Sequence, residues 1–299
     1  LARRAAEESL VLLNNDGAVL PLAAGTKTVV IGDFAKNPRY QGAGSSMVNS
    51  TQVDVLLDKL MDSELNLIGY AQGFDRHGKP DAALRKSACE LAAQADTVIL
   101  CMGLDEIAES EGLDRSSMKL AQNQVDLLQA LAAANPKIVV VLYSGGAVET
   151  PWLDKCQALL YAALSGQAGA GAVVDALVGK VNPCGKLAET WPLSYADVPS
   201  AANFAGKKKT VEYREGLYIG YRYFDTARKA VRFPFGYGLS YTTFEYSDMV
   251  ANERGVSIAV KNTGTATGTE IVQLYVSKKN GQIFRPAKEL KGFARHCAG

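Results

Sequence analysis

The chain has 299 residues, with 32 basic and 31 acidic side chains and a formal net charge of +1. This length predicts two domains, and a hydrophobic content of 47% is enough for a buried core, which excludes a mainly disordered protein. The balanced charge gives no electrostatic footprint for nucleic acid or an anionic membrane, and the apolar runs fall far short of the ~20 residues that a membrane helix needs.

The two histidines and five cysteines limit the chemistry further. His77 lies in a polar, turn-like stretch and His296 near the end of the sequence, and neither has a spaced partner, which argues against a zinc site or a histidine-based triad. We therefore expect no metal or other cofactor. The cysteines are dispersed and form no CxxC motif, which argues against a disulfide scaffold and favours a reducing compartment such as the cytoplasm.

The sequence opens on an amphipathic helix pattern at residues 2–9 and not on a signal peptide. Because it starts at Leu1 without a methionine, we expect a piece of a longer protein, and its localisation is left unassigned.

Residues 1–195 alternate strand-like and helix-like segments, which predicts βαβ units and a doubly wound, mainly parallel sheet with helices on both faces. Two continuous apolar runs are typical of strands buried on both faces. We expect strands at Thr28–Gly32, Leu65–Tyr70, Thr97–Gly103, Ile138–Tyr143 and Ala158–Leu164, and helices at Val53–Met61, Ala82–Ala95, Gln122–Ala133 and Gly171–Leu177.

Functional residues in such sheets lie beyond the carboxyl ends of the strands. Three loops leave those ends, after Gly32, after Gly103 and after Ser144. We expect Gly103 and Ser144 to end neighbouring strands, and the chemistry of the protein to lie on these loops.

The pattern changes after Pro192. Residues 196–240 form a linker rich in glycine and aromatic residues, and residues 241–299 show short alternating runs typical of a β-sandwich. A complete sandwich needs about 100 residues, whereas this part has 59. We expect it either to pack on the α/β domain through Phe233–Tyr241 or to pair its strands with a second copy of the chain, which would make a homodimer.

An acidic loop follows the strand that ends at Gly103. It carries five carboxylates within the ten residues 105–114, followed at once by Arg115. A carboxylic acid there could act as a general acid if its pKa were raised. The alternative is a solvated acidic loop without chemistry.

The glycine-rich stretch Tyr40–Ser46 lies beyond the first strand. A nucleotide site is a weak interpretation, since no GxGxxG motif opens a helix here; a flexible or close-packed loop fits better. The aromatic stretches Gly216–Phe224 and Phe233–Tyr241 are typical of a segment that packs tightly across another domain.

A set of motifs, taken together and in their order along the chain, resembles glycoside hydrolase family 3, the β-glucosidase and β-xylosidase family. The motifs span nearly the whole chain: Glu8–Asn15 with Leu20–Leu22, Gly42–Ser46, Glu109–Arg115, Gly145–Trp152, Asn182–Leu187, Glu215–Arg222, Pro234–Tyr241 and Arg285–Phe293.

The resemblance implies an α/β sandwich domain followed by the first half of a fibronectin-III-like domain. The (β/α)8-type barrel of the family, which needs roughly 250 residues and carries the aspartate nucleophile, is absent, so no nucleophile is expected in this chain. By the same resemblance Glu111 is the candidate general acid/base and Glu109 the fallback. Asp114 and Arg115 are candidates for an ion pair that supports the loop.

The expected partners are a β-linked oligosaccharide or glycoside and the missing barrel domain, with Gly44, Ser45 and Ser46 as candidates for the substrate pocket. The expected function is therefore that of an accessory domain of a retaining, exo-acting β-glycosidase that is inactive by itself. The alternative is a non-catalytic carbohydrate-binding or scaffold module.

Overall fold

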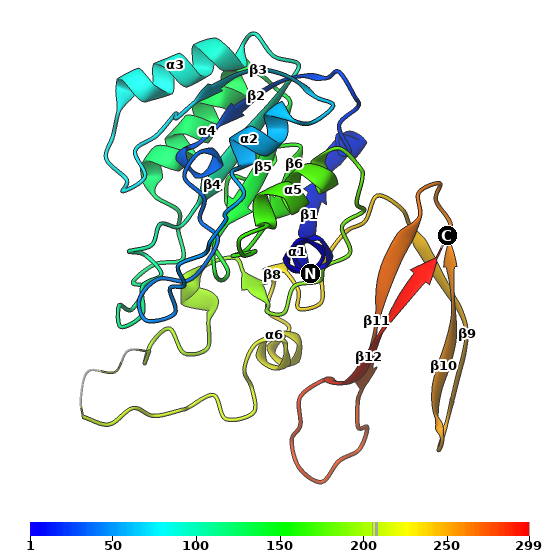
Figure 1. The fold of residues 1–299 in the computed structure, drawn as a ribbon. Coiled ribbons are helices and arrows are strands. Elements are labelled where there is room, and N and C mark those ends of the chain that lie inside the picture. Colours follow the sequence, from blue (N-terminus) through cyan, green and yellow to red (C-terminus); the bar gives the residue numbers. More distant parts are fainter. Residues whose placement is uncertain (205, 207–208, 299) are drawn as a thin grey trace.

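A computed structural model describes the whole chain except residues 205, 207, 208 and 299. Its central element is a six-stranded sheet in the order β1-β6-β5-β4-β2-β3, in which every pair except β1–β6 is parallel (Figure 1). The strands are β1 (Val11–Asn15), β2 (Lys27–Ile31), β3 (Asn66–Ala71), β4 (Thr97–Gly103), β5 (Ile138–Tyr143) and β6 (Ala158–Tyr161).

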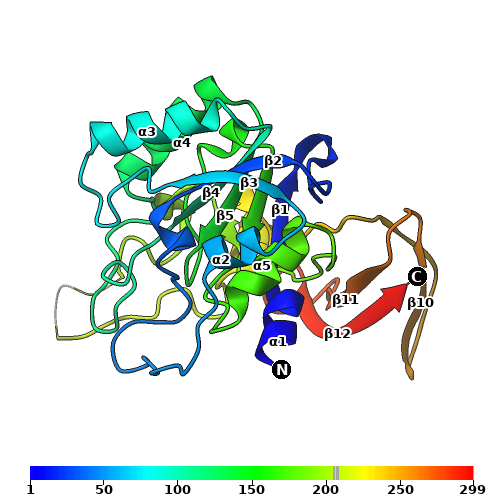
Figure 2. The ribbon, with the colours of Figure 1, turned by 45° about the horizontal axis from the view of Figure 1, so that its top comes forward.

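Helices cover both faces of this sheet, which confirms the predicted doubly wound, mainly parallel architecture. Figure 2 shows α3 and α4 on one face and α1, α2 and α5 on the other. None of the helices in the described part of the chain is long and apolar enough to cross a membrane. The helices are α1 (Ala2–Ser9), α2 (Leu56–Met61), α3 (Ala82–Ala92), α4 (Gln122–Ala134) and α5 (Gly169–Leu177).

The strands β4 and β5 form the centre of the core, because every one of their residues is buried. They pair in parallel with Gly103 beside Tyr143, which confirms that the two strands are neighbours and that Gly103 ends one of them; β5 ends at Tyr143, one residue before the predicted Ser144. A Cβ atom on Gly103 would lie 2.0 Å from the main-chain oxygen of Tyr143. Only glycine therefore fits where β4 ends.

The edge strand β1 was not among the predicted strands. It runs antiparallel to β6, and Leu12 also forms a β-bridge with Leu239 of the distant linker. In the short run Val11–Asn15 the first three residues are buried and the last two are not. Its strand character comes from these partners far away in sequence, which a local pattern does not contain.

The linker folds back onto the α/β domain. Its strand β8 (Val231–Phe233) pairs with β7 (Trp191–Pro192), and a short helix α6 (Tyr221–Ala227) precedes it. The buried Trp191 ring packs edge-on against both Tyr161 and Phe233. The predicted boundaries at residues 195 and 240 are untested and stay predictions. In the described part of the chain, single-turn 3-10 helices lie in the connections at Asp16–Ala18, Asp33–Ala35, Leu153–Lys155 and Tyr195–Asp197.

Two antiparallel hairpins form the partial fibronectin-III-like region that the sequence predicted. One joins β9 (Phe244–Asn252) to β10 (Gly255–Asn262), and the other joins β11 (Gly268–Val276) to β12 (Glu289–Ala298).

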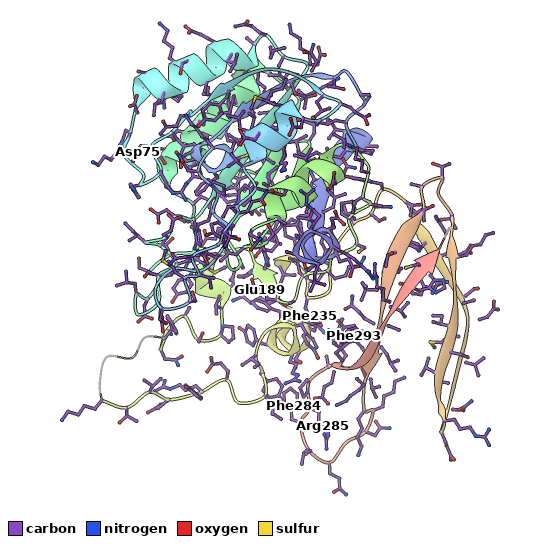
Figure 3. The ribbon with its side chains drawn as sticks, in the orientation of Figure 1. Asp75, Glu189, Phe235, Phe284, Arg285 and Phe293 are labelled. Atoms are coloured by element: carbon purple, nitrogen blue, oxygen red, sulfur yellow. The ribbon has the colours of Figure 1, made fainter. Side chains whose placement is uncertain are left out.

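The second hairpin packs on the α/β domain, which is the first of the two expected outcomes. The side chain of Gln273 donates to the carbonyl of Gly236 at 3.0 Å, and Lys186 forms a salt bridge with Glu270 at 3.3 Å. Apolar side chains of the hairpins are still exposed, as Phe293 is with 72% of its surface (Figure 3). Pairing of two copies through these strands stays a prediction.

Candidate functional site

The candidate site lies where the strand order reverses. The strand β2 has β3 on one side and β4 on the other, so the connections from β2 to β3 and from β3 to β4 run in opposite directions along the sheet. In open α/β sheets this switch point opens a crevice at the carboxyl ends of the strands. The loops after β2, β4 and β5 leave this edge, as the sequence predicted.

The glycine-rich loop and the acidic loop meet at this edge. Ala43 and Ser110 form a parallel β-bridge, and the N–H of Glu111 donates to the carbonyl of Ala43 at 3.3 Å. Gly44 has a φ of +91°, and a Cβ atom there would lie 2.7 Å from the Cβ of Glu111. Both the left-handed backbone and the close approach of the second loop require glycine at this position.

Glu111 is exposed, and its carboxylate is held by Ser45. The oxygen Oε2 accepts from the Ser45 N–H at 2.9 Å and from the Ser45 hydroxyl. These bonds stabilise the charged form, so the hydroxyl and then the N–H hold the pKa of Glu111 below its ordinary value. Ser46 is exposed beside this contact. The structure thus brings Gly44 and Ser45 to Glu111, with Ser46 next in the chain, and the roles of all three stay proposals.

Glu109, the fallback acid, points inward. Its two carboxylate oxygens accept from the N–H of Gly145 at 2.8 and 2.9 Å, and Oε2 lies 3.3 Å from the guanidinium of Arg39. The side chains of Glu109 and Arg39 are 10% and 1% exposed. Glu109 therefore connects three loops and does not face solvent.

Arg115 and Asp114 do not form the ion pair that the sequence led us to expect. The Arg115 guanidinium donates to the carbonyl of Ala147 at 3.4 Å, and the salt bridges of the described residues do not include one between these two. Asp114 is exposed. The guanidinium instead reaches across to the loop after β5.

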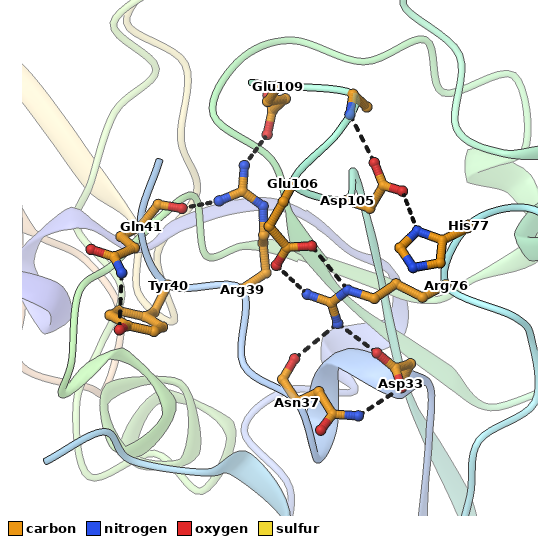
Figure 4. A network of polar contacts seen from close by, with 11 residues as sticks. Asp33, Asn37, Arg39, Tyr40, Gln41, Arg76, His77, Asp105, Glu106 and Glu109 are labelled. Atoms are coloured by element: carbon orange, nitrogen blue, oxygen red, sulfur yellow. Dashed lines mark hydrogen bonds and ion pairs between the residues drawn. The ribbon is translucent and has the colours of Figure 1, made fainter. Parts of the chain in front are cut away.

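A second ionic cluster, centred on Arg76, was not predicted from the sequence (Figure 4). Arg76 binds Asp33 after β2 and both oxygens of Glu106 after β4, and its guanidinium lies over the ring of Phe34. Burial alone would raise the pKa of Glu106, but the hydrogen bonds and charge of Arg76 outweigh it and lower that pKa. Beside this cluster, Asp105 is 3.0 Å from His77 Nδ1.

Glu189 is a further carboxylate near this edge that the sequence did not indicate. Much of the surface of Glu189 is exposed. The partial removal of water around its carboxyl is the larger effect and raises its pKa, whereas the hydrogen bond from the Ala147 N–H is a smaller effect that lowers it. An added Cβ at Gly146 would lie 3.5 Å from Glu189 Oε1. It comes from an irregular segment distant in sequence, so no local signal could have placed it there.

The carboxylates of this edge are not arranged as metal ligands. Across residues 1–298, apart from residues 205, 207 and 208, no group of three or more His, Cys, Asp or Glu side chains has the geometry to hold a metal ion. The site is instead a set of carboxylates paired with arginine, serine and backbone N–H donors.

The sheet is doubly wound, and an exposed glutamate bound by serine lies at its switch point. These features define the chain as an α/β domain with carboxylates at the carboxyl-end edge of its sheet. The C-terminal domain of glycosyl hydrolase family 3 matches residues 10–241, and the chain belongs to this family.

Relatives match nearly the whole chain. It is 45% identical to thermostable beta-glucosidase B of Acetivibrio thermocellus and 43% identical to an exo-alpha-(1->6)-L-arabinopyranosidase of Bifidobacterium breve, each across 99% of this chain. The crystal structure of a Bifidobacterium adolescentis GH3 beta-glucosidase superposes with a TM-score of 0.95 at 44% identity, across 99% of this chain and 44% of that one. The chain spans only about 40% of the length of the curated relatives, namely 40% and 41% of these two.

Proposed function

We propose that this chain is the α/β and partial fibronectin-III-like part of a retaining, exo-acting β-glycosidase, and that Glu111 is its general acid/base. The observation that carries the proposal is the position of Glu111, exposed at the switch point and held by Ser45 on the neighbouring loop. The beta-glucosidase names of relatives across 99% of the chain support it.

The proposed mechanism needs two carboxyl groups about 5–5.5 Å apart. A carboxylate on another part of the longer protein attacks the anomeric carbon, while the protonated Glu111 gives its proton to the leaving oxygen. The resulting glycosyl-enzyme is then hydrolysed by a water molecule, from which the Glu111 carboxylate takes a proton. Glu111 supplies the proton-transfer half of this reaction.

The lowered pKa of Glu111 bears on this role. A general acid must be protonated at the working pH, which a carboxyl achieves when it is removed from water. In the described chain the Glu111 side chain is exposed and Ser45 favours its charged form. We infer that a further part of the protein, together with bound substrate, covers Glu111 and raises its pKa.

The proposed substrate is a β-D-glucoside, with an α-L-arabinopyranoside as the second candidate. The first rests on the beta-glucosidase relatives and the second on the arabinopyranosidase relatives of similar identity. In both sugars the leaving oxygen is equatorial on a pyranose ring, so one placement of the acid serves both.

The test compares two leaving groups in the longer protein. Glu111→Gln should lower kcat/KM about 10²–10⁴-fold for an alkyl glucoside, whose leaving group needs the proton. For a dinitrophenyl glucoside, whose leaving group barely needs the proton, Glu111→Gln should lower kcat/KM only slightly. The matched control is Glu253→Gln, which removes the same charge from an exposed turn between β9 and β10.

The 299-residue chain alone should hydrolyse neither substrate, because one carboxyl cannot both attack and donate. An equal loss on both substrates in the longer protein would contradict the acid/base role of Glu111. A longer protein that binds glycosides but cleaves none would support the alternative, a non-catalytic carbohydrate-binding or scaffold module.

A further inference from the structure

The segment that carries Glu111 has no regular secondary structure of its own. No helix or strand is assigned between Gly103 at the end of β4 and Gln122 at the start of α4. A regular helix or strand therefore does not fix the position of the Glu111 carboxyl. The isolated bridge to Ala43 and the side-chain contacts from this loop to its neighbours do so.

The best-buried of these contacts is made two residues before Glu111. Glu109 accepts from the N–H of Gly145, in the turn after β5, and from Arg39, in the loop after β2. Arg39 also donates to the main-chain carbonyl of Gln41. One carboxylate thus joins all three loops of the site, and Figure 4 shows the Arg39 guanidinium between Gln41 and Glu109.

Burial separates this contact from the Arg76–Glu106 ion pair of the same loop. Glu106 is five residues before Glu111, and its side chain is 42% exposed. Glu109 is 10% exposed and its partner Arg39 only 1%. Exposed ion pairs contribute little to structure, whereas removing one partner of a buried pair leaves an uncompensated charge that the surroundings must rearrange to hydrate. The Arg39–Glu109 pair is therefore the stronger constraint.

The constraint passes directly to the acid/base candidate. Arg39 and Glu109 bring the two loops together at the same place where Ala43 pairs with Ser110 and the N–H of Glu111 binds Ala43. The next contact along both loops is the one between Ser45 and the Glu111 carboxylate.

We propose that Arg39 and Glu109 form a positioning bridge, anchored on the Gly145 N–H, that holds the Glu111 carboxyl where it transfers its proton. The inference rests on the proposed function of Glu111. It gives Glu109 a different role from that of a fallback acid, because both of its oxygens are bound by donors inside the protein. Glu109 is a positioning residue and acts only through Glu111.

A double-mutant cycle in the longer protein tests this bridge. A misplacement of about 1 Å costs about 10²-fold in rate, so Glu109→Ala should lower kcat/KM on an alkyl glucoside by about that factor. It should leave kcat/KM on a dinitrophenyl glucoside nearly unaffected, because that leaving group barely needs the proton. In a Glu111→Gln background, Glu109→Ala should cause little further loss, since residues that act as a unit are not additive.

Conservative variants keep the test sound if the alanine variant folds poorly. Glu109→Gln keeps an oxygen for the Gly145 N–H but loses the charge that faces Arg39, and Arg39→Lys keeps a charge but loses the planar fork. For each of these two variants, the ratio of kcat/KM on the alkyl glucoside to kcat/KM on the dinitrophenyl glucoside should lie between the ratios of the parent and of Glu109→Ala. Glu253→Gln is the charge-matched control and should leave that ratio unchanged.

Hydrogen exchange on the 299-residue chain reports the position of the loop without activity. Glu109→Gln should speed exchange of the Ser45 and Glu111 amides while the amides of β5 stay protected. Equal loss on both substrates, or additive loss in the Glu111→Gln background, would overturn the bridge. If Glu111→Gln shows its full effect and the Glu109 variants show none, only the bridge fails. If Glu111→Gln shows no dependence on the leaving group, the proposed function itself fails.

Discussion

The α/β domain and the two hairpins use the same kinds of apolar residue with opposite results. Val140 in β5 is fully buried, whereas Val256 in β10 is 42% exposed. Helices cover both faces of β5, whereas β10 pairs with β9 in a two-stranded sheet and none of its residues is buried. Apolar burial contributes roughly 25 cal/mol per Å². A valine therefore stabilises the α/β domain, where it is buried, and contributes less to the hairpins, where it stays exposed.

The comparison also explains where the site is. The loops around Glu111 are as exposed as the hairpins, yet they leave a sheet edge whose strands are buried on both faces. A rigid scaffold with mobile, polar loops is the usual arrangement for binding and catalysis. The hairpins have exposed strands without such a scaffold beneath them.

The largest expected difference is in core truncations. Leu142→Ala, in β5, should cost about 2–5 kcal/mol in the free energy of unfolding, because Leu142 is fully buried. Leu274→Ala, at a partly exposed position of β11, should cost less than about 1 kcal/mol. Urea unfolding followed by tryptophan fluorescence and by circular dichroism measures both, since Trp152 and Trp191 are buried in the α/β domain. Equal costs would contradict the comparison.

A glycine pair gives a smaller effect. Gly103→Ala would place a Cβ 2.0 Å from the Tyr143 carbonyl oxygen, while Gly292→Ala in β12 meets nothing within 4 Å. The first should destabilise the chain by about 1–3 kcal/mol, and the second by less than about 0.5 kcal/mol. Thermal unfolding of the two variants side by side measures this. A tolerated Gly103→Ala would show that the β4–β5 contact is looser than the structure has it.

The smallest effect concerns pH and the site loops. Ser45 lowers the pKa of Glu111 from an ordinary value of 4.5. A folded-state pKa below the unfolded one stabilises the chain above the unfolded pKa, and this contribution is lost as the pH falls through the folded pKa. Ser45→Ala removes the hydroxyl but keeps the N–H, so it should move the Glu111 pKa up toward 4.5 and reduce that small pH dependence. Carbon-13 NMR titration of the glutamate carboxyls follows the change. An unchanged Glu111 pKa would show that the Ser45 hydroxyl does not bind the carboxylate.

The sequence predicted the parts of the fold that are encoded locally. The continuous apolar runs that became β4 and β5 needed no information beyond their own residues. The strand β1 escaped prediction because its partners, β6 and Leu239, lie far away in sequence.

The same limit applies to the site. That the loops with Ser45 and Glu111 share one sheet edge follows from parallel topology, but the contact between them does not. Arg39 gave no signal at all, because arginine is normally hydrated and its partner Glu109 lies 70 residues away. Asp114 and Arg115 show the opposite error, since adjacency in sequence predicted a pair that the fold does not make.

The central claim is that Glu111 protonates the leaving oxygen and later activates water. The most direct measurement uses Glu111→Ala in the longer protein, with a dinitrophenyl β-glucoside and added azide. Azide needs no general base, so it should attack the accumulated glycosyl-enzyme, raise the turnover rate and yield the β-glycosyl azide, identified by proton NMR. A rate that azide does not change, with free glucose as the only sugar product, would contradict the account.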